Sequence, residues 1–352
     1  MPEPAGLDVF RNLLNDRVLT ADIVSDLEPP HHFSDARFSN YKPEEQYPSQ
    51  NEALDKLHQF VSSAQAPYGR FERIARSLIG RKHVEQTQGI YLDGGFGVGK
   101  THLLAATYYA YKGRKAYLSF QELMFAVGLQ KLEGTFTTFA NYELLLLDEF
   151  ELDDPANTRI ASNLLQKLMD RGVRIVTTSN TPPGAWGKDR FSIQDFEREL
   201  HDLARRFEVI RIDGEDYRTL HQHMDRRQAS WCNAEDAGFG DLERKLLASS
   251  LRPLSLRFEE LIDIISKAHP MRIRKALTGF DALVLKDLTP IGHPNEALRF
   301  VYFIDKAYDQ NLQLLVSSPV LPTDIFAGNV LNGGDVKKYR RTISRIREMT
   351  EV

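Results

Sequence analysis

One stretch, "GIYLDGGFGVGKTHLLAAT" at residues 89–107, constrains this chain more than any other feature. Within it, Gly94, Gly99, Lys100 and Thr101 satisfy the spacing G-x-x-x-x-G-K-[ST], which lets backbone N–H groups, an ammonium and a hydroxyl surround phosphate oxygens. "GIYL" has the apolar run of a short buried strand, and "THLLAATYYAY" has the apolar spacing of a helix. The N-terminal dipole of that helix would favour a bound anion. The stretch therefore predicts a strand, a phosphate-binding loop and a helix, in that order.

The side chains of this loop have predicted roles in holding a nucleotide and its metal ion. Lys100 is expected to reach the β and γ phosphates, and the Thr101 hydroxyl is expected to ligate a magnesium ion that bridges them. The nucleotide-binding residues predicted from the motif are Gly94, Gly95, Gly97, Val98, Gly99, Lys100, Thr101 and His102. ATP and Mg²⁺ are accordingly the expected cofactors.

Polar side chains follow the next two apolar strands along the chain. In "LLLLDEF", residues 144–150, Asp148 is predicted to orient the magnesium ion together with Thr101, and Glu149 to polarise the attacking water. The later strand "VRIVTTSN" ends at Asn180, whose side chain can hold the water between Glu149 and the γ phosphate. Strand, helix and strand with polar residues at the carboxyl ends are typical of an open parallel sheet with its ligand site at that edge.

Composition bounds the remaining functions. The chain has 352 residues with 42% hydrophobic and 27% charged content, enough for one large domain or two smaller ones. A net charge of -4 argues against a broad basic surface for nucleic acid, so such a partner is not expected. The single cysteine, Cys232, fits a reducing compartment. Without a signal-like start or a run of 18 apolar residues, we expect a cytoplasmic protein that does not span a membrane, with peripheral association left open.

The order of these motifs resembles that of the AAA+ ATPases. Four stretches in particular are similar to the ZapE cell-division ATPases and their mitochondrial AFG-type relatives. They are "LLLLDEF" through "TTSNTPPGAW" (144–186), "DGEDYR" (213–218), "NEALRFVYFIDKAYDQNLQLLVSS" (295–318) and "YRRTISRIREM" (339–349). The resemblance spans roughly residues 40 to 350. The chain departs from it at Pro155 and Arg159, and "THLLAAT" looks more like the helix of DnaA and DnaC-type proteins.

This resemblance implies an α/β fold: a P-loop NTPase (AAA+) core with a parallel sheet flanked by helices, and a C-terminal α/β extension or lid. It also implies an ATP hydrolase that works as a homo-oligomer and remodels a protein partner, which for ZapE-like proteins would be the division-ring protein FtsZ. The mitochondrial relatives imply protein quality control instead. Two alternatives stay open: a DnaA- or DnaC-like loader or initiator in DNA replication, and a nucleotide-gated scaffold with negligible turnover. Glu149 argues against the scaffold, because a pure switch has less need of a water-activating acid.

The resemblance further implies functional arginines. In AAA+ enzymes an arginine from a neighbouring subunit completes the site, because a guanidinium stabilises the charge that develops on the γ-phosphoryl oxygens. Arg206, just before the predicted strand "FEVIRI", occupies the expected place, with Arg205 and Arg198 as competitors. For a lid arginine that senses nucleotide, Arg299 and Arg341 both remain candidates.

The expected organisation is an N-terminal arm (1–35), an ATPase core (36–218) and a C-terminal α/β extension with a lid-like region (219–352). The extension, from "FDALVLKDLTPI" onwards, repeats the strand, turn, helix, strand and proline-bearing loop order of the core. Lys286 and Asp287 stand there in place of the acidic pair, and no second phosphate-loop motif precedes them. We therefore expect this region to be structural rather than catalytic.

Overall fold

The chain folds into two compact units, described in a computed structural model. The structure describes residues 5–15, 27–65, 88–152, 154–183, 186, 197–215, 231–232, 237–328, 330 and 335–350. The five-stranded unit comprises residues 23–29 and 33–221. The four-stranded unit comprises residues 1–22, 30–32 and 222–352.

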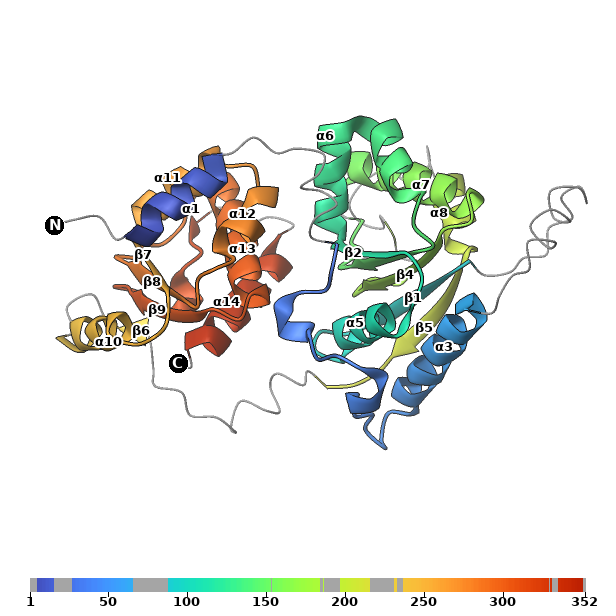
Figure 1. Cartoon of the computed structure of the whole chain (residues 1–352), viewed down its shortest axis with the longest axis horizontal. Coiled ribbons are helices and arrows are strands. Elements are labelled where there is room, and N and C mark those ends of the chain that lie inside the picture. Colours follow the sequence, from blue (N-terminus) through green and yellow to red (C-terminus); the bar gives the residue numbers. More distant parts are fainter. Residues whose placement is uncertain are drawn as a thin grey trace, which may run out of the picture. The chain divides into compact units, whose positions relative to one another are not determined.

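The five-stranded unit is an α/β layer structure around a parallel sheet of strand order β2-β3-β4-β1-β5. Its elements are η2 (Phe38–Asn40), α3 (Pro48–Gln65), β1 (Gly89–Gly94), α5 (Lys100–Ala110), β2 (Lys115–Ser119), α6 (Phe120–Phe139), β3 (Leu144–Asp148), α7 (Pro155–Asp170), β4 (Arg174–Ser179), α8 (Glu197–Ala204) and β5 (Phe207–Ile212). Figure 1 shows α3 and α5 on one face of the sheet and α6, α7 and α8 on the other. Strands covered on both faces need near-continuous apolar sequences, and every residue of β3 is buried.

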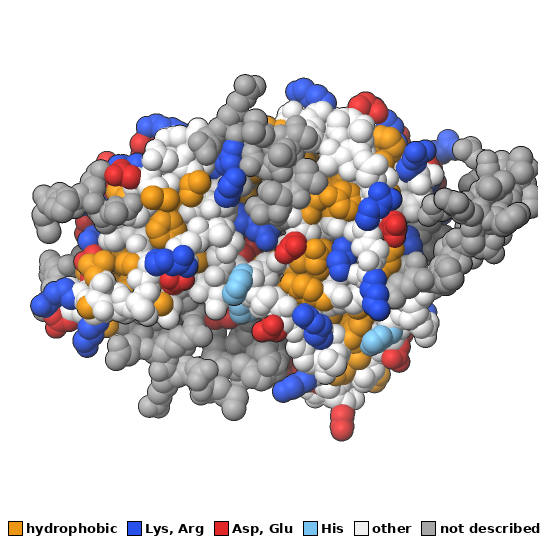
Figure 2. Space-filling model, in the orientation of Figure 1, with side chains coloured by type: hydrophobic (Ala, Val, Ile, Leu, Met, Phe, Trp, Pro, Cys, Tyr) orange, Lys and Arg blue, Asp and Glu red, His pale blue; other side chains and the backbone are white. Residues whose placement is uncertain are grey.

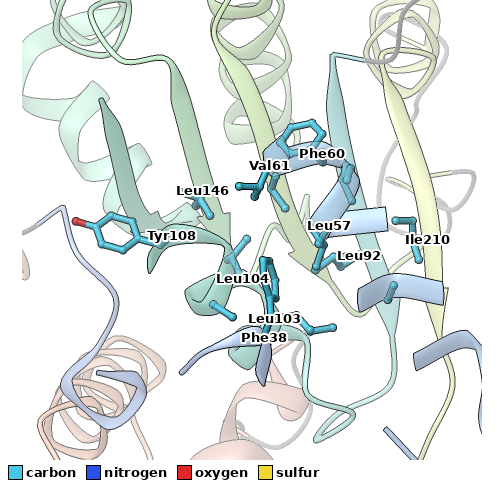
Figure 3. Close-up of a cluster of buried hydrophobic side chains, with 14 of the residues drawn as sticks. Phe38, Leu57, Phe60, Val61, Leu92, Leu103, Leu104, Tyr108, Leu146 and Ile210 are labelled. Carbon is cyan, nitrogen blue, oxygen red and sulfur yellow. The ribbon is translucent and has the colours of Figure 1, made fainter. Parts of the chain in front are cut away.

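One buried hydrophobic cluster of this unit lies between the sheet and the helices α3 and α5. Leu103 and Leu104 of α5 are fully buried, and they cluster with Leu92, Leu146 and other strand residues (Figure 3). Burying two leucine side chains contributes roughly 3 to 6 kcal/mol. The start of α5, and with it the loop, is thereby fixed against the strand ends.

Local signals in the sequence begin the helices on the opposite face. Ser119 caps α6 in a capping box, in which its hydroxyl accepts from the Glu122 N–H and the Glu122 carboxylate accepts from the Ser119 N–H. Asp154 caps α7 by accepting from the Asn157 N–H at 2.8 Å, with Pro155 as the first helical residue. Each helix therefore begins directly beside a strand end.

The four-stranded unit is a second parallel α/β structure, with strand order β6-β9-β8-β7. Its elements are α1 (Ala5–Asn15), β6 (Trp231–Cys232), α10 (Ala237–Leu247), β7 (Pro253–Arg257), α11 (Phe258–Lys267), α12 (Met271–Leu277), β8 (Ala282–Lys286), α13 (Pro294–Asp309), β9 (Gln313–Ser317), η5 (Pro322–Asp324) and α14 (Val336–Thr350). The helix expected in an N-terminal arm, α1, packs on α12 and β7 of this unit, where Phe10 meets the edges of Phe280 and Phe303.

The predicted fold class is confirmed: parallel sheets flanked by helices form the core and the C-terminal α/β region. On the face that Figure 2 shows, described Lys and Arg side chains are spread among acidic and apolar ones. No helix among the described residues is both long and apolar enough to cross a membrane.

Candidate nucleotide site

The predicted site residues meet at the carboxyl edge of the five-stranded sheet. Because the strands are parallel and in register, Asp93 pairs with Ser179 at the ends of β1 and β4. Asp148 likewise pairs with Ser119 at the ends of β3 and β2. The phosphate loop, residues 95–99, continues from β1 at this edge into α5. The topology thus brings together residues that lie far apart in the sequence.

The glycines of the loop are needed for two different physical reasons. Gly97 and Gly99 have positive φ angles of 69° and 88°, which side-chain-bearing residues rarely adopt. A Cβ at Gly99 would also lie 2.7 Å from the Cε2 atom of Tyr41. At Gly94 the constraint is close packing instead, because a Cβ there would lie 2.4 Å from the carbonyl oxygen of Ile212 on β5.

Lys100 is held inside the loop, with 8% of its surface exposed. Its ammonium donates to the carbonyl oxygen of Gly94 at 2.8 Å, to that of Gly95, and to Oδ1 of Asn180 at 2.9 Å. The amide nitrogen of Asn180 in turn donates to Oε1 of Glu151 at 2.9 Å. The structure therefore places Lys100 and Asn180 in contact, as a pair that faces the same position above the strand ends.

Asp148 is the most heavily hydrogen-bonded group of the site and is 8% exposed. Its Oδ1 accepts from the Thr101 hydroxyl at 3.3 Å, from the N–H of Glu149 at 3.1 Å and from the Thr178 hydroxyl. Its Oδ2 accepts from the Tyr117 hydroxyl at 2.8 Å. Hydrogen bonds to both oxygens fix the orientation of the carboxylate.

Thr101 and Asp148 fit a magnesium ion. Hard cations of this size prefer hydroxyl and carboxylate oxygens, and these two side chains present both within hydrogen-bond distance of each other. Among the described residues, no group of three or more His, Cys, Asp or Glu side chains is arranged to hold a metal. The remaining ligands would therefore be water and phosphate oxygens, which is how Mg²⁺ is usually held beside a nucleotide.

Glu149 begins a tight turn after β3. It has a φ of 54°, and its N–H donates to the Thr178 hydroxyl at 3.0 Å. The next N–H, of Phe150, donates to the main-chain oxygen of Thr178 at 2.8 Å. A left-handed conformation at a residue other than glycine costs roughly 1 to 3 kcal/mol, which these bonds and the burial of Phe150 offset. The turn carries the chain away from the sheet immediately after the two acids.

A segment ahead of α3 packs on the start of α5. The ring nitrogen Nε2 of His102 is 3.2 Å from the carbonyl oxygen of Arg37, and the His102 ring lies 5.7 Å from the Tyr41 ring. Burial lowers the pKa of His102 and raises that of Tyr41 to about 12, so both are neutral near pH 7. In the structure, His102 thus binds the protein backbone beside the phosphate loop.

Two of the three candidate trans-acting arginines, Arg205 and Arg206, lie at the opposite edge of the sheet, directly before β5. Arg206 forms an ion pair with Asp170 at 2.8 Å and donates to Oε1 of Gln88 at 3.3 Å, just before β1 and β5 begin. Six strand residues, about 20 Å, separate this edge from Gly94. Arg205 in the same turn is exposed.

Both candidate lid arginines are bonded within the four-stranded unit. Arg299 donates to the carbonyl oxygen of Ala268 at 2.7 Å, and Arg341 pairs with Asp305 at 2.7 Å. Burial acts to raise the pKa of Asp305, but Arg341 and its neighbour Arg345 hold that pKa below its usual range.

Sequence reasoning missed Thr178 and Tyr117, which both donate to Asp148. Thr178 belongs to the quoted strand end "TTSN", so its place at the edge was predictable, although its bond to Asp148 was not. Tyr117 carries no motif at all. Its strand alternation and the β2–β3 register put it within reach of Asp148, and only the tertiary structure shows this.

The chain is similar to known proteins over much of its length. A family model described as "AFG1-like ATPase" matches residues 18–249 and 255–352. The Cell division protein ZapE of Escherichia coli (strain K12) is 26% identical over 323 residues, covering 80% of this chain and 83% of that protein. The Chromosomal replication initiator protein DnaA of Lactococcus lactis subsp. cremoris is 25% identical over 197 residues, covering 51% and 42%. A structure of AMPPCP-bound DnaA from Aquifex aeolicus, 15% identical, covers 88% of this chain and 79% of its own, with a TM-score of 0.37.

Proposed function

The chain belongs to the AFG1-like ATPase family, and we propose that it hydrolyses ATP in a homo-oligomer and uses the energy to remodel a protein partner. The observation that carries the proposal is the contact of Lys100 with Asn180 beside that of Thr101 with Asp148. These two contacts join the phosphate loop to two neighbouring strand ends. An ammonium, a hydroxyl and a carboxylate gathered in this way support the binding of a nucleoside triphosphate with Mg²⁺.

In this proposal each side chain has one task. Lys100 would leave its loop carbonyls to bind the β and γ phosphates, and Thr101 and Asp148 would hold Mg²⁺, which neutralises phosphate charge. Glu149 would accept the proton of the attacking water, and Asn180 would position that water beside it. Each of these groups is already at the carboxyl edge, so binding of ATP needs side-chain movement rather than refolding.

The proposed oligomer follows from the place of the arginines. Arg206, at the far edge, would stabilise charge on the γ-phosphoryl group bound by a neighbouring subunit. Arg206 pairs with Asp170, and 29% of its side chain is exposed. The more exposed Arg205 and Arg198 remain competitors for this role.

The test is ATP turnover as a function of protein concentration. We expect turnover per chain to rise steeply with concentration, Glu149→Gln to abolish it while nucleotide binding persists, and Arg206→Ala to abolish it while assembly persists. Asp170→Ala is the matched control, because it removes the same ion pair and keeps the guanidinium. Turnover independent of concentration and unchanged by Arg206→Ala would refute the trans role. Measuring Arg205→Ala and Arg198→Ala in parallel assigns the role among the three.

For the partner, we propose a protein of the cytoplasmic division machinery, with FtsZ as the first candidate. The support is the similarity to a relative named as a cell division protein, which spans most of both chains. Sedimentation of FtsZ polymers with ATP, beside the Glu149→Gln variant, tests this. We expect a change in the amount of pelleted FtsZ that requires ATP hydrolysis, and an unchanged pellet would exclude FtsZ as the partner.

Two outcomes would favour the alternative functions. Retention of single-stranded DNA would favour the replication-loader alternative, which the partial match to DnaA suggests. Negligible turnover under every condition would favour the scaffold alternative.

A further inference from the structure

The four-stranded unit has the topology of the ATPase unit. Its sheet order β6-β9-β8-β7 matches β1-β4-β3-β2 of the five-stranded sheet strand for strand. The chain order also agrees, because β6, α10, β7, α11, β8, α13 and β9 occur in the order of β1, α5, β2, α6, β3, α7 and β4, with α12 as an additional helix between α11 and β8. In both units every described strand pair is parallel.

The last helix and strand of this match have the same residue spacing in both units. Residues 155–183 and 294–322 align without a gap, each beginning with the proline that opens a helix, α7 or α13. Both helices are followed by a residue with positive φ, Gly172 at 95° and Asn311 at 58°. Each of these residues reverses the chain into the next strand, so the two segments share turns as well as elements.

The turn after the third strand is the same in both units. Asp287 has a φ of 59° and Glu149 a φ of 54°. The N–H of Asp287 donates to the Ser317 hydroxyl at 2.9 Å, as that of Glu149 donates to the Thr178 hydroxyl at 3.0 Å. The following N–H bonds to the main-chain oxygen of the same Ser or Thr, at 2.9 and 2.8 Å.

The first strands correspond as well, although β6 is very short. The Tyr91 hydroxyl donates to the carbonyl oxygen of Thr181 at 2.6 Å, and the Trp231 indole donates to that of Val320 at 3.0 Å. Thr181 and Val320 are matched positions in the gap-free alignment. Matching apolar residues also face the helix that follows the first strand of each sheet. They are Leu92, Leu146 and Val176 on the α5 side, and Cys232, Val284 and Leu315 on the α10 side.

The chemistry of the site does not survive in the second unit. The positions of Asp148, Glu149 and Asn180 are taken by Lys286, Asp287 and Pro319. Residues 233–236 alone separate β6 from α10, and no G-x-x-x-x-G-K-[ST] motif occurs there. The groups that would bind phosphate, metal and water are therefore missing together.

An ion pair stands where the metal site would be. Lys286 at the end of β8 pairs with Glu243 of α10 at 2.6 Å, with 35% and 17% of the two side chains exposed. Ser255 donates to the same carboxylate at 3.2 Å, from the strand position that Tyr117 occupies when it donates to Asp148. In the four-stranded unit the acid, Glu243, is on the helix, and the base, Lys286, is at the strand position of Asp148. The strand and the helix are therefore joined directly by an ion pair.

We propose that residues 231–322 form a second, degenerate copy of the P-loop fold that binds no nucleotide. In this copy the Lys286–Glu243 pair permanently links the sheet to α10. Each chain then holds a single nucleotide, in the five-stranded unit. In the four-stranded unit, the contact between the sheet and α10 then does not depend on ATP. This inference is independent of whether the chain hydrolyses ATP or what partner it remodels.

The first test is nucleotide stoichiometry. Titration of the full chain with mant-labelled ADP and MgCl₂ should saturate at one nucleotide per chain, and Lys100→Ala should remove the saturable signal. Saturable binding that persists in Lys100→Ala and is lost on further substitution Lys286→Ala would overturn the proposal. Because the probe is a bound nucleotide, this result is separate from turnover.

The second test is hydrogen exchange in the peptides of α10 and β8. We expect Glu243→Gln and Lys286→Met each to speed exchange there by roughly fivefold, and the double exchange Glu243→Lys with Lys286→Glu to restore it. Asp241→Asn is the matched control, since Asp241 pairs on the exposed face of α10 with Arg244. Unchanged exchange in both single variants would refute the link. Protection of these peptides by nucleotide in Lys100→Ala would refute the absence of a second site.

Discussion

Removing the hydroxyl group of Tyr117 should weaken magnesium binding, although Tyr117 itself is not a proposed ligand of the metal ion. Tyr117 is 3% exposed, and its O–H donates to Oδ2 of Asp148 at 2.8 Å. Tyr117→Phe keeps the ring and deletes only this charge-assisted bond, a loss of about 1 to 2 kcal/mol. Groups that orient a metal ligand from behind typically change metal affinity 10- to 100-fold. We therefore expect the Mg²⁺ concentration for half-maximal binding of mant-labelled ATP to rise about tenfold.

The same sheet offers a matched control for that change. The Tyr111 hydroxyl donates to Oε2 of Glu143 at 2.9 Å, at the other edge of the sheet, just before β3 begins. Tyr111→Phe thus removes an equivalent tyrosine–carboxylate bond far from the phosphate loop. Nucleotide binding titrated with MgCl₂, and repeated in EDTA, separates the two effects. A Mg²⁺ dependence equal to wild type in Tyr117→Phe, or an equal shift in Tyr111→Phe, would refute a positioning role for Tyr117.

Three further substitutions test other parts of the structure. Asp305→Asn should lower the free energy of unfolding by about 3 kcal/mol, because it leaves the buried guanidinium groups of Arg341 and Arg345 without their carboxylate. Urea denaturation followed by fluorescence measures this loss. Asp281 is bonded by Arg252, which lowers its pKa to about 2, so its contribution to stability should be present above about pH 4 and disappear as the pH falls towards 2. Asp281→Asn should make the urea midpoint depend less on pH over that range. An unchanged pH dependence would contradict this contribution of Asp281 to stability. Gly99→Ala should destabilise the fold and weaken nucleotide binding, whereas Gly128→Ala, where a Cβ meets nothing within 4 Å, should not, as thermal unfolding with and without nucleotide would show.

Much of the candidate site follows from sequence because its residues stand at strand ends. Parallel pairing aligns those ends whatever the intervening helices do, so Lys100, Asp148 and Asn180 meet once the strands are recognised. Apolar runs such as "LLLL" identify the strands, and the glycine spacing identifies the loop. The parts with a strong local signal were therefore predictable.

Contacts that depend on packing between elements carried no such signal. Tyr117 reaches Asp148 only because β2 lies beside β3 in one particular register. Tyr41 lies against Gly99 because the chain ahead of α3 crosses the start of α5, and a tyrosine in a loop is compatible with many other placements. Glycine at position 94 was expected for phosphate binding, yet its requirement for close packing against β5 becomes clear only in three dimensions.

The second unit changes what the strained turn at Glu149 can be taken to mean. A left-handed residue beside a reactive carboxylate invites a catalytic explanation, in which strain is kept because the chemistry needs it. Asp287 has the same conformation and the same N–H bond to a strand-end hydroxyl, but it has no phosphate loop before it and no partner asparagine. The strain therefore belongs to the way this strand leaves the sheet. The catalytic role proposed for Glu149 rests on its carboxylate and on its place next to Asp148 in the chain. Glu149→Gln keeps the turn and removes the carboxylate, so it is the substitution that tests this role.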